Sequence, residues 1–260
     1  MSSSLFDLSG KVAIVTGSAQ GLGRFFSNTL ANAGADLVIT DLNVESLNLT
    51  KNDIELLGKK VLSLPLDVRD YDSVQNMVES AYSFFGKIDI LVNNAGCNVR
   101  KPAIDITKDD WDKVINTNLR GSFFTAQAVA KKMIISKYGR IINIGSVTSV
   151  FGYADISPYC ASKGGIKQLT MSLADEWGKY GVTVNCLAPG WISTEQTRPL
   201  FENKAWVEYI IDRIPLKRLG SIEELGGLLI FLASDASSYV TGQTILADGG
   251  ITTGATKAKI

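Results

Sequence analysis

Short runs of apolar, mostly β-branched residues recur along the chain, and longer segments with apolar residues at helical spacing separate them. These runs are apolar throughout rather than alternating with polar residues. They therefore predict strands covered on both faces, as in parallel sheets with crossover helices. We expect a single-domain, doubly wound α/β fold around a seven-stranded parallel sheet. The predicted strands are Val12–Thr16, Leu37–Thr40, Val61–Leu66, Ile88–Val92, Ile141–Ile144, Val182–Leu187 and Thr244–Ala247.

The segment 191–220, between the sixth and seventh predicted strands, has a different pattern. It contains two prolines and several aromatic residues, among them Phe201, Trp206 and Tyr209, but no strand signal. A connection of this kind is more typical of a loop over a binding site than of a separate domain. We predict that residues 191–220 form a lid over a substrate.

The amino-acid composition excludes several kinds of catalytic site and several kinds of partner. The 260 residues include no histidine, which excludes Ser-His-Asp and Cys-His catalysis and histidine metal ligands. Twenty-six basic residues balance twenty-six acidic ones, so no overall field favours nucleic acid or an anionic membrane. The three cysteines have no metal-binding or disulfide spacing, and we expect no metal site. With no signal peptide or membrane span in the sequence, we expect a cytoplasmic protein whose partners are a small molecule and copies of itself.

Glycines follow the first predicted strand directly, in the pattern GxxxGxG, and a helical segment begins there. A loop of this kind lets the backbone approach a phosphate at a helix N-terminus, which is the arrangement of a Rossmann-type dinucleotide site. A tight strand-to-helix turn without any ligand is the alternative. The residues assigned to the cofactor from this loop are Gly17, Gln20, Gly21, Leu22 and Gly23.

Asp41 ends the second predicted strand, where a carboxylate can accept hydrogen bonds from both ribose hydroxyls of an adenosine and repel a 2′-phosphate. We therefore predict NAD as the cofactor, with NADP less favoured, although Arg24 stands close to the loop. A polar residue that merely closes a strand is the alternative for Asp41. Further cofactor contacts are predicted by position at Leu42, Asp67, Val68, Asn94, Ala95 and Gly96.

Tyr159 and Lys163 are four residues apart, so they share one face of a predicted helix. An ammonium beside a phenol favours the phenolate, which makes tyrosine usable as an acid/base. Ser146 follows the fifth predicted strand, at the edge where open α/β sheets bind ligands. Asn118 lies in mid-helix, where an amide can hold water or a backbone carbonyl.

These motifs stand together in one order: TGSAQGLG at 16–23, NNAG at 93–96, then Asn118, Ser146, Tyr159-x-x-x-Lys163 and Pro189-Gly190. In this the chain resembles the short-chain dehydrogenase/reductase family over nearly its whole length. The resemblance implies Tyr159 as the general acid/base and Ser146 as the group that binds the substrate oxygen. It also implies Lys163 on the nicotinamide ribose and Asn118 in a proton relay through water.

The same resemblance implies further contacts and an assembly. Pro189, Gly190, Ile192 and Thr194 match positions that touch the nicotinamide. The chain is similar to the short oxidoreductase branch of the family, whose members are usually homotetramers joined through long helices and the last strand.

The substrate is less well defined by the sequence. The run 94–119, with Ala174-Asp175-Glu176-Trp177, resembles the gluconate 5-dehydrogenase and 2-deoxy-gluconate 3-dehydrogenase members of the family. This implies conversion between a secondary alcohol and a ketone on a sugar acid or polyol. We predict that Arg100 binds the carboxylate, with Lys101 beside it. A solvated surface or a subunit contact is the alternative for these two cations.

Three other activities stay open at this point. A 3-oxoacyl carrier-protein reductase shares all the general motifs, and a steroid or small-diol dehydrogenase is a further enzymatic reading. A protein that senses NAD without catalysis belongs to a different class, and a degenerate set of catalytic residues would favour it. Here all four of those residues are present.

Overall fold

The computed structural model describes residues 5–193 and 201–254. Within this part of the chain, seven strands form one parallel sheet in the order β3-β2-β1-β4-β5-β6-β7, which confirms the predicted fold class. Two strands have the predicted bounds and the other five differ by at most two residues at either end. The strands are β1 (Val12–Thr16), β2 (Asp36–Asp41), β3 (Val61–Pro65), β4 (Ile90–Asn93), β5 (Gly139–Ile144), β6 (Val182–Pro189) and β7 (Thr244–Ala247).

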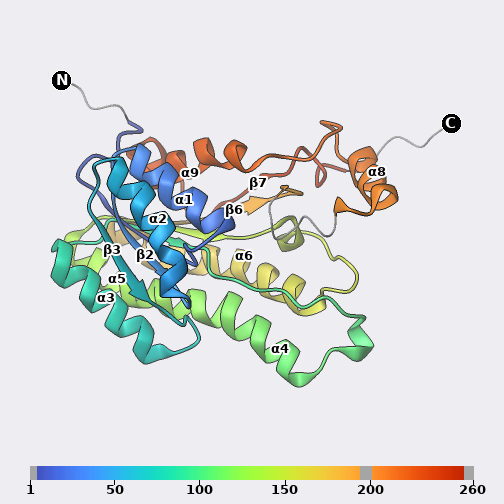
Figure 1. The fold of residues 1–260 in the computed structure, drawn as a ribbon, viewed down its shortest axis with the longest axis horizontal. Coiled ribbons are helices and arrows are strands. Elements are labelled where there is room, and N and C mark those ends of the chain that lie inside the picture. The colour runs from blue at the N-terminus through green and yellow to red at the C-terminus, as the bar shows by residue number, and fades with distance from the viewer. Residues whose placement is uncertain (1–4, 194–200, 255–260) are drawn as a thin grey trace.

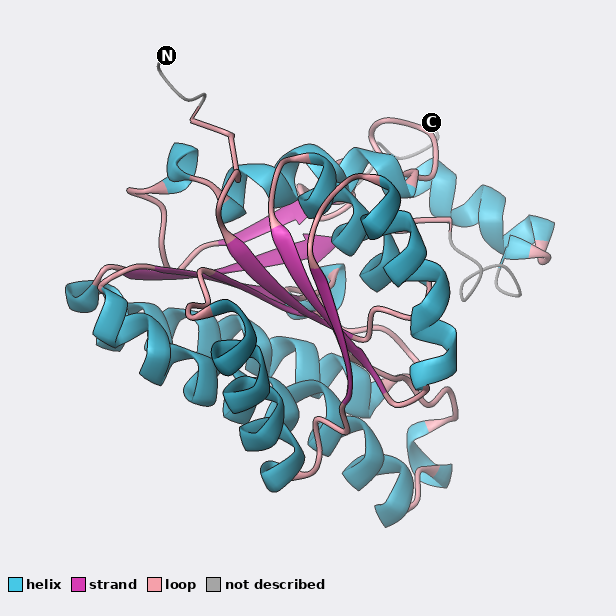
Figure 2. Cartoon of the chain, turned by 60° about the vertical axis from the view of Figure 1, so that its left-hand side comes forward, coloured by secondary structure: helices cyan, strands magenta, loops and turns pink. Residues whose placement is uncertain are grey.

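Helices cover both faces of the sheet (Figures 1 and 2). Helices α1, α2 and α9 lie on one face, and α3, α5 and α6 lie on the other. No described helix is both long enough and apolar enough to cross a membrane. The helices are α1 (Gly21–Asn32), α2 (Val44–Leu56), α3 (Tyr71–Phe85), α4 (Lys108–Ile115), the π-helix η2 (Asn116–Gly121), α5 (Ser122–Ser136), α6 (Ser157–Trp177), α8 (Lys204–Arg213) and α9 (Gly226–Ala233), with short 3₁₀ turns η1 (Ala103–Asp105), η3 (Val147–Ser149), η4 (Gly178–Tyr180), η5 (Ile222–Leu225) and η6 (Asp235–Ser237).

The central strands are buried on both faces, which explains why their sequences do not alternate. Every residue of β1, β4 and β5 is buried. On one face Phe26 and Leu47 pack from α1 and α2, and on the other Met77 and Trp177 pack from α3 and α6. Burial of these large side chains on both sides of the sheet supplies the main stabilisation of the fold.

The strand order reverses between β1 and β4. The chain proceeds outward from β1 to β2 and β3, then returns to place β4 on the other side of β1. Such a switch point leaves a crevice beyond the carboxyl ends of the strands, where doubly wound folds bind their ligands. The register pairs Val15 with Val92, so the loops after β1 and β4 emerge side by side.

Candidate active site

The glycine loop after β1 adopts the backbone that its sequence predicts. Gly17 and Gly21 have φ values of +69° and +54°, which favour glycine. A Cβ on Gly23 would collide with the carbonyl of Gly17 and with the side chain of Asn94. Helix α1 can therefore approach the loop this closely only because glycine stands at position 23.

The N-terminus of α1 fits a bound pyrophosphate. Gln20 occupies the N-cap position, but its side chain does not cap the helix, and the first turn carries no acidic residue. Gly21 has open space where a Cβ would stand, and both Gln20 and Gly21 are exposed, whereas Leu22 is half-buried. The first backbone N–H groups of α1 are thus open to an anion, and the helix dipole favours its charge.

Asp41 lies at the carboxyl end of β2 with its carboxylate held by backbone groups. Oδ2 accepts a hydrogen bond from Ala19 N at 3.1 Å, and Oδ1 accepts one from Asn43 N at 3.3 Å. Arg24, the cation nearest to the loop in sequence, is paired with Asp53 through Nε at 3.0 Å and Nη2 at 2.8 Å. The adjacent Leu42 is 67% exposed. The carboxylate of Asp41 is thus held in place at the end of β2, and Arg24, which the sequence left as a candidate cation for this site, is engaged by Asp53.

The loop after β4 is fastened to the glycine loop by Asn94 and by Thr16, which the sequence analysis did not single out. Asn94 Nδ2 donates to the carbonyls of Thr16 and Gly17 at 2.9 and 3.0 Å. The Thr16 hydroxyl accepts from the backbone N–H groups of Asn94 and Ala95, both at 3.0 Å. Gly96 stands next to the side chain of Asn118. A hydroxyl at the last residue of β1 was the available signal for Thr16.

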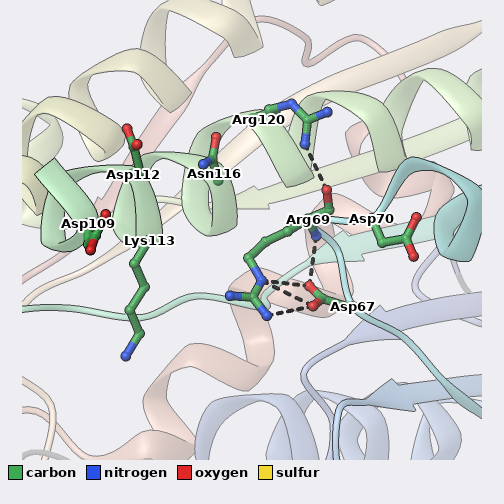
Figure 3. Close-up of a pocket in the computed structure, with 8 residues that line it drawn as sticks. All are labelled: Asp67, Arg69, Asp70, Asp109, Asp112, Lys113, Asn116 and Arg120. Atoms are coloured by element: carbon green, nitrogen blue, oxygen red, sulfur yellow. Dashed lines mark hydrogen bonds and ion pairs between the residues drawn. The ribbon is translucent and has the colours of Figure 1, made fainter.

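Asp67 follows β3 and forms an ion pair with Arg69, as Figure 3 shows. Arg69 Nη2 lies 2.6 Å from Asp67 Oδ2, and this contact lowers the pKa of Asp67. The pair lines a cavity of about 450 Å³ that also includes Asp109, Asp112, Lys113, Asn116 and Arg120, and none of the predicted catalytic residues borders it. Val68 is buried against Gly121. The sequence did not indicate that an arginine engages the predicted adenine contact Asp67.

Tyr159, Ser146 and Lys163 come together beyond the carboxyl ends of β5 and β6. Ser146 follows β5, and its hydroxyl accepts a hydrogen bond from Thr148 N at 3.2 Å. Its side chain faces the phenol of Tyr159, which lies in the first turn of α6, and this contact lowers the pKa of the phenol. Lys163, one turn further along α6, places its ammonium 5.5 Å from the centre of the Tyr159 ring. The predicted serine, tyrosine and lysine therefore form one cluster.

Burial governs the ionisation of this cluster in the protein chain itself. It raises the pKa of Tyr159 to about 12, which the contact with Ser146 opposes. It lowers the pKa of Lys163 to about 8. Lys163 is 5% exposed and donates to the carbonyl of Ile144 at 2.6 Å. The sequence predicts that Lys163, together with the nicotinamide cation, favours the phenolate; in the chain alone, desolvation raises the pKa of the phenol.

Asn118 lies in a π-helix rather than in the regular helix that the sequence predicts. π-Helical turns are rare and are frequent at functional sites. The side chain is 1% exposed; Oδ1 accepts from Cys97 N at 2.8 Å, and Nδ2 donates to Cys97 O and to Ser162 Oγ. The amide therefore ties the loop after β4 to α6 at Ser162, the residue directly before Lys163, and its hydrogen bonds are made to protein groups. A water-holding role for this side chain stays a prediction.

The end of β6 brings the predicted nicotinamide contacts to the same edge of the sheet. Pro189 is the last residue of β6, and Gly190 packs so closely against Asp248 that a Cβ there would collide with its backbone. Ile192 is buried and forms a bridge with Gly220. Thr194 lies outside the described residues.

Arg100 and Lys101 differ in their surroundings. Lys101 Nζ lies 2.6 Å from Asp110 Oδ2, so this charge is neutralised within the chain. Arg100 is exposed, and it makes no ion pair with any residue that the structure describes. Its guanidinium carbon lies 6.0 Å from the ring centre of Tyr153. Of the two predicted cations, Arg100 alone is left available to an anionic ligand.

Comparison with known proteins places this geometry in a family. A family model described as enoyl-(acyl carrier protein) reductase matches residues 17–252. Gluconate 5-dehydrogenase of Gluconobacter oxydans is 42% identical over 95% of this chain and 97% of its own. A 3-oxoacyl-[acyl-carrier-protein] reductase of Thermotoga maritima is 40% identical over 94% of this chain and 98% of its own.

A solved structure has nearly the same fold. A gluconate 5-dehydrogenase from Burkholderia cenocepacia, in complex with NADP and tartrate, superimposes with a TM-score of 0.93. It is 40% identical and matches 96% of this chain and 98% of its own. Together with the glycine loop, the paired Ser146 and Tyr159, and Lys163 one turn away, these similarities show that the chain belongs to the short-chain dehydrogenase/reductase family of NAD(P)-dependent oxidoreductases.

Proposed function

We propose that this enzyme interconverts a secondary alcohol and a ketone on a sugar acid of the gluconate type, with Tyr159 as general acid/base. The observation that carries the proposal is that Tyr159, Ser146 and Lys163 lie together at the edge of the sheet where this fold binds ligands. The gluconate-related names of two relatives support the substrate class.

The proton chemistry belongs to the chain's own residues. The Tyr159 hydroxyl donates its proton to the ketone oxygen in reduction and recovers it from the alcohol in oxidation. The Ser146 hydroxyl binds the same substrate oxygen and holds it in line with the phenol. Lys163 adds positive charge next to the ring, and Asn118 keeps the loop after β4 in register with α6. The nicotinamide, when bound, supplies or accepts the hydride.

We infer that the cofactor is NAD(H) in preference to NADP(H). The glycine loop and the N-terminus of α1 would hold the pyrophosphate, and Asp41 would bind the adenosine ribose. The fixed carboxylate of Asp41 repels a 2′-phosphate, and Arg24 is engaged by Asp53. The NADP in the Burkholderia structure argues in the other direction. A kinetic comparison of the two cofactors therefore belongs in any test.

Arg100 is the proposed anchor for the substrate carboxylate. A carboxylate that enters a closed site needs a cation, because an unpaired buried anion is expensive. Arg100 has no acidic partner among the residues the structure describes, whereas Lys101 is paired with Asp110. Helix α8 belongs to the lid predicted at 191–220, of which residues 194–200 lie outside the described residues, and it would lie over the bound substrate.

The proposed function is tested by turnover of D-gluconate, 5-keto-D-gluconate and neutral polyols and ketones with NAD(H) and NADP(H). We expect gluconate-type substrates with NAD(H) to be preferred. We also expect Arg100→Ala to lower kcat/KM for an acid by about ten- to a hundred-fold while turnover of neutral substrates hardly changes. Equal losses on both, or no loss, would exclude Arg100 as the anchor.

A carrier-protein reductase is the second candidate, favoured by the family-model description and by the Thermotoga relative. It predicts efficient reduction of an acetoacetyl thioester and a preference for NADPH. Turnover of that thioester far above any sugar acid would replace our proposal.

We also propose that the protein self-associates, as a homotetramer. An apolar groove runs between α4, η2 and α5 on one side and α6 on the other, lined by Ile115, Leu119, Phe123 and Leu169. A second copy can cover such a face, and long helices at this position suit the assembly that the family resemblance implies. Light scattering of the purified protein measures the assembly directly; a monomer at micromolar concentration would refute it.

A further inference from the structure

An aromatic cluster stands beside the active site. Three half-buried rings meet edge to face: Tyr153 lies 5.4 Å from Trp191, and Trp191 lies 5.0 Å from Trp206, measured between ring centres. They come from three separate segments: the loop after η3, the loop after β6, and α8. The indole Nε1 of Trp206 donates a hydrogen bond of 2.8 Å to the hydroxyl of Tyr153.

This cluster contacts the segments that carry the catalytic groups. Trp191 and Trp206 pack against a small core that contains Val147, the neighbour of Ser146. The carbonyl of Tyr153 lies 3.7 Å from the thiol of Cys160, the neighbour of Tyr159. Tyr153 is therefore held between the serine and tyrosine segments of the site.

The hydrogen bond from Trp206 fixes the direction of the Tyr153 hydroxyl. An indole N–H is only a donor, so the phenol oxygen must be the acceptor in this bond. The hydroxyl proton of Tyr153 must consequently be directed elsewhere, and no acceptor for it exists among the described residues. Arg100 places its guanidinium 6.0 Å from the same ring, also without an acidic partner in the described part of the chain.

We propose that Tyr153 is a second recognition residue for the substrate carboxylate, acting next to Arg100, with Trp206 as its positioning residue. The inference rests on the proposed function and extends it to a two-donor anion subsite. A carboxylate has two oxygens that accept hydrogen bonds, and a guanidinium together with a phenol O–H satisfies both. Because Trp206 lies on α8, the same hydrogen bond ties this helix to the subsite.

Two variants test the assignment with little change of shape. Tyr153→Phe removes the hydroxyl and keeps the ring; Trp206→Phe keeps an aromatic ring and removes the N–H donor. Tyr239→Phe is the matched control, because Tyr239 is a fully exposed tyrosine that lies outside the predicted lid.

The measurement compares D-gluconate with sorbitol, which has the same six-carbon chain but no carboxylate. Dissociation constants come from quenching of tryptophan fluorescence in the NADH-loaded enzyme, and kcat and KM from turnover where it occurs. We expect Tyr153→Phe to weaken gluconate binding and raise its KM about ten-fold, with sorbitol binding changed less than two-fold. Trp206→Phe should give a smaller loss, about three-fold, in the same direction.

Coupling with Arg100 gives a second readout that a structural role would not produce. If both donors bind one carboxylate, the effect of Tyr153→Phe on gluconate should shrink to less than three-fold in an Arg100→Ala background. Equal weakening of gluconate and sorbitol, or no weakening at all, would overturn the inference while leaving the proposed function intact. Failure of the wild-type enzyme to bind or convert any sugar acid would instead refute the proposed function itself.

Discussion

The two ends of the parallel sheet differ in whether their buried charged groups have a partner of opposite charge. At the amino end, every buried charged group that the structure describes has a partner of opposite charge. Arg140, 5% exposed, pairs with Asp235 at 3.0 Å, and Asp89 accepts from Lys87 at 2.9 Å and from Val12 N at 2.8 Å. At the carboxyl end, the ammonium of buried Lys163 donates to the carbonyl of Ile144, and no carboxylate pairs with it within the described chain.

The pKa values reflect this difference. Burial without a counter-charge lowers the pKa of Lys163 to about 8 and raises that of Tyr159 to about 12. Buried charges are costly unless paired, so Lys163 costs stability at the carboxyl end, where we propose that Tyr159 transfers the proton. At the amino end the buried charged groups are paired, and we expect them to contribute to stability. Substitutions at the two ends should therefore separate activity from stability.

The largest effect is expected from Tyr159→Phe. Loss of the hydroxyl removes the only proposed proton donor, so turnover should fall by at least about a thousand-fold, or ~4 kcal/mol in barrier. Binding of NADH should stay nearly unchanged, because the ring is retained. Tyr138→Phe, at the amino end, is the control; its hydroxyl donates to Asp235, and it should keep wild-type turnover. A Tyr159→Phe enzyme with a tenth of wild-type activity would refute the mechanism.

Arg140→Ala should produce the reverse pattern. The change removes hydrogen bonds to Asp235, to the carbonyl of Ser234 and to the carbonyl of Gly139, and it leaves a hole under Tyr138. We expect a loss of about 2–3 kcal/mol in the free energy of unfolding, or roughly 5–10 °C in Tm, with kcat at 25 °C unchanged. Arg218→Ala removes an exposed pair with Glu224 and should change the free energy of unfolding far less than Arg140→Ala does. A similar loss in the free energy of unfolding from Arg140→Ala and Arg218→Ala would contradict the claim that the buried charge pair stabilises the amino end of the sheet.

Lys163→Met should abolish turnover and yet stabilise the fold. The folded pKa of about 8 is below the ordinary value of 10.5, so the unfolded chain binds more protons between these pH values. Wild-type stability therefore rises as pH increases from about 8 to 10.5. At pH 7 we expect the free energy of unfolding of Lys163→Met to exceed that of the wild type by about 1–2 kcal/mol. The difference should shrink as the pH rises from about 8 to 10.5, and urea denaturation at each pH measures it. Lys167→Met, one turn along α6, should show neither effect.

The smallest of these effects concerns β2, which has an aspartate at each end. Asp41→Ala should reduce the preference for NADH over NADPH in kcat/KM by about ten-fold, because repulsion of a 2′-phosphate disappears. Asp36→Ala, at the amino end, removes a hydrogen bond to Lys60 N and should leave cofactor preference unchanged. Strong NADPH preference in the wild-type enzyme would overturn the interpretation of Asp41.

The strands and the residues that follow them could be predicted from the sequence. Strands buried on both faces produce apolar runs, and the glycine loop, Ser146, Tyr159 and Lys163 lie at fixed distances from these runs along the chain. Local pattern was therefore sufficient for the strands, and together with the family resemblance it indicated that Ser146, Tyr159 and Lys163 lie close together. The order of strands follows from the general rule for doubly wound sheets rather than from any residue.

Contacts between distant segments were not predictable in the same way. Asn93 donates to Asn143 at 2.9 Å, and Asn143 donates to Thr170 at 3.0 Å, which joins β4, β5 and α6 in a buried network. The Tyr153–Trp206 hydrogen bond likewise links residues 53 positions apart. Polar residues of this kind show no periodicity, and their partners depend on tertiary packing.

The groups around the Tyr159 phenol could be predicted from the sequence, but the direction of its pKa shift in the chain alone could not. The sequence shows that Lys163 is one turn away, but it does not show how deeply the pair is buried. In the chain alone, desolvation is the largest cause and raises the pKa of the phenol. Spacing identifies the groups that interact, whereas the sign of the pKa shift depends on burial that only the folded structure provides.

The most direct test of the central claim is ultraviolet titration of the tyrosines between pH 6 and 10, read as the difference between wild type and Tyr159→Phe. Without cofactor, we expect no tyrosinate from Tyr159 in this range, because burial raises its pKa to about 12. With saturating NAD⁺, the added positive charge should bring one tyrosinate signal into the range. No difference signal with NAD⁺, or the same signal with and without it, would contradict the assignment of Tyr159 as the acid/base.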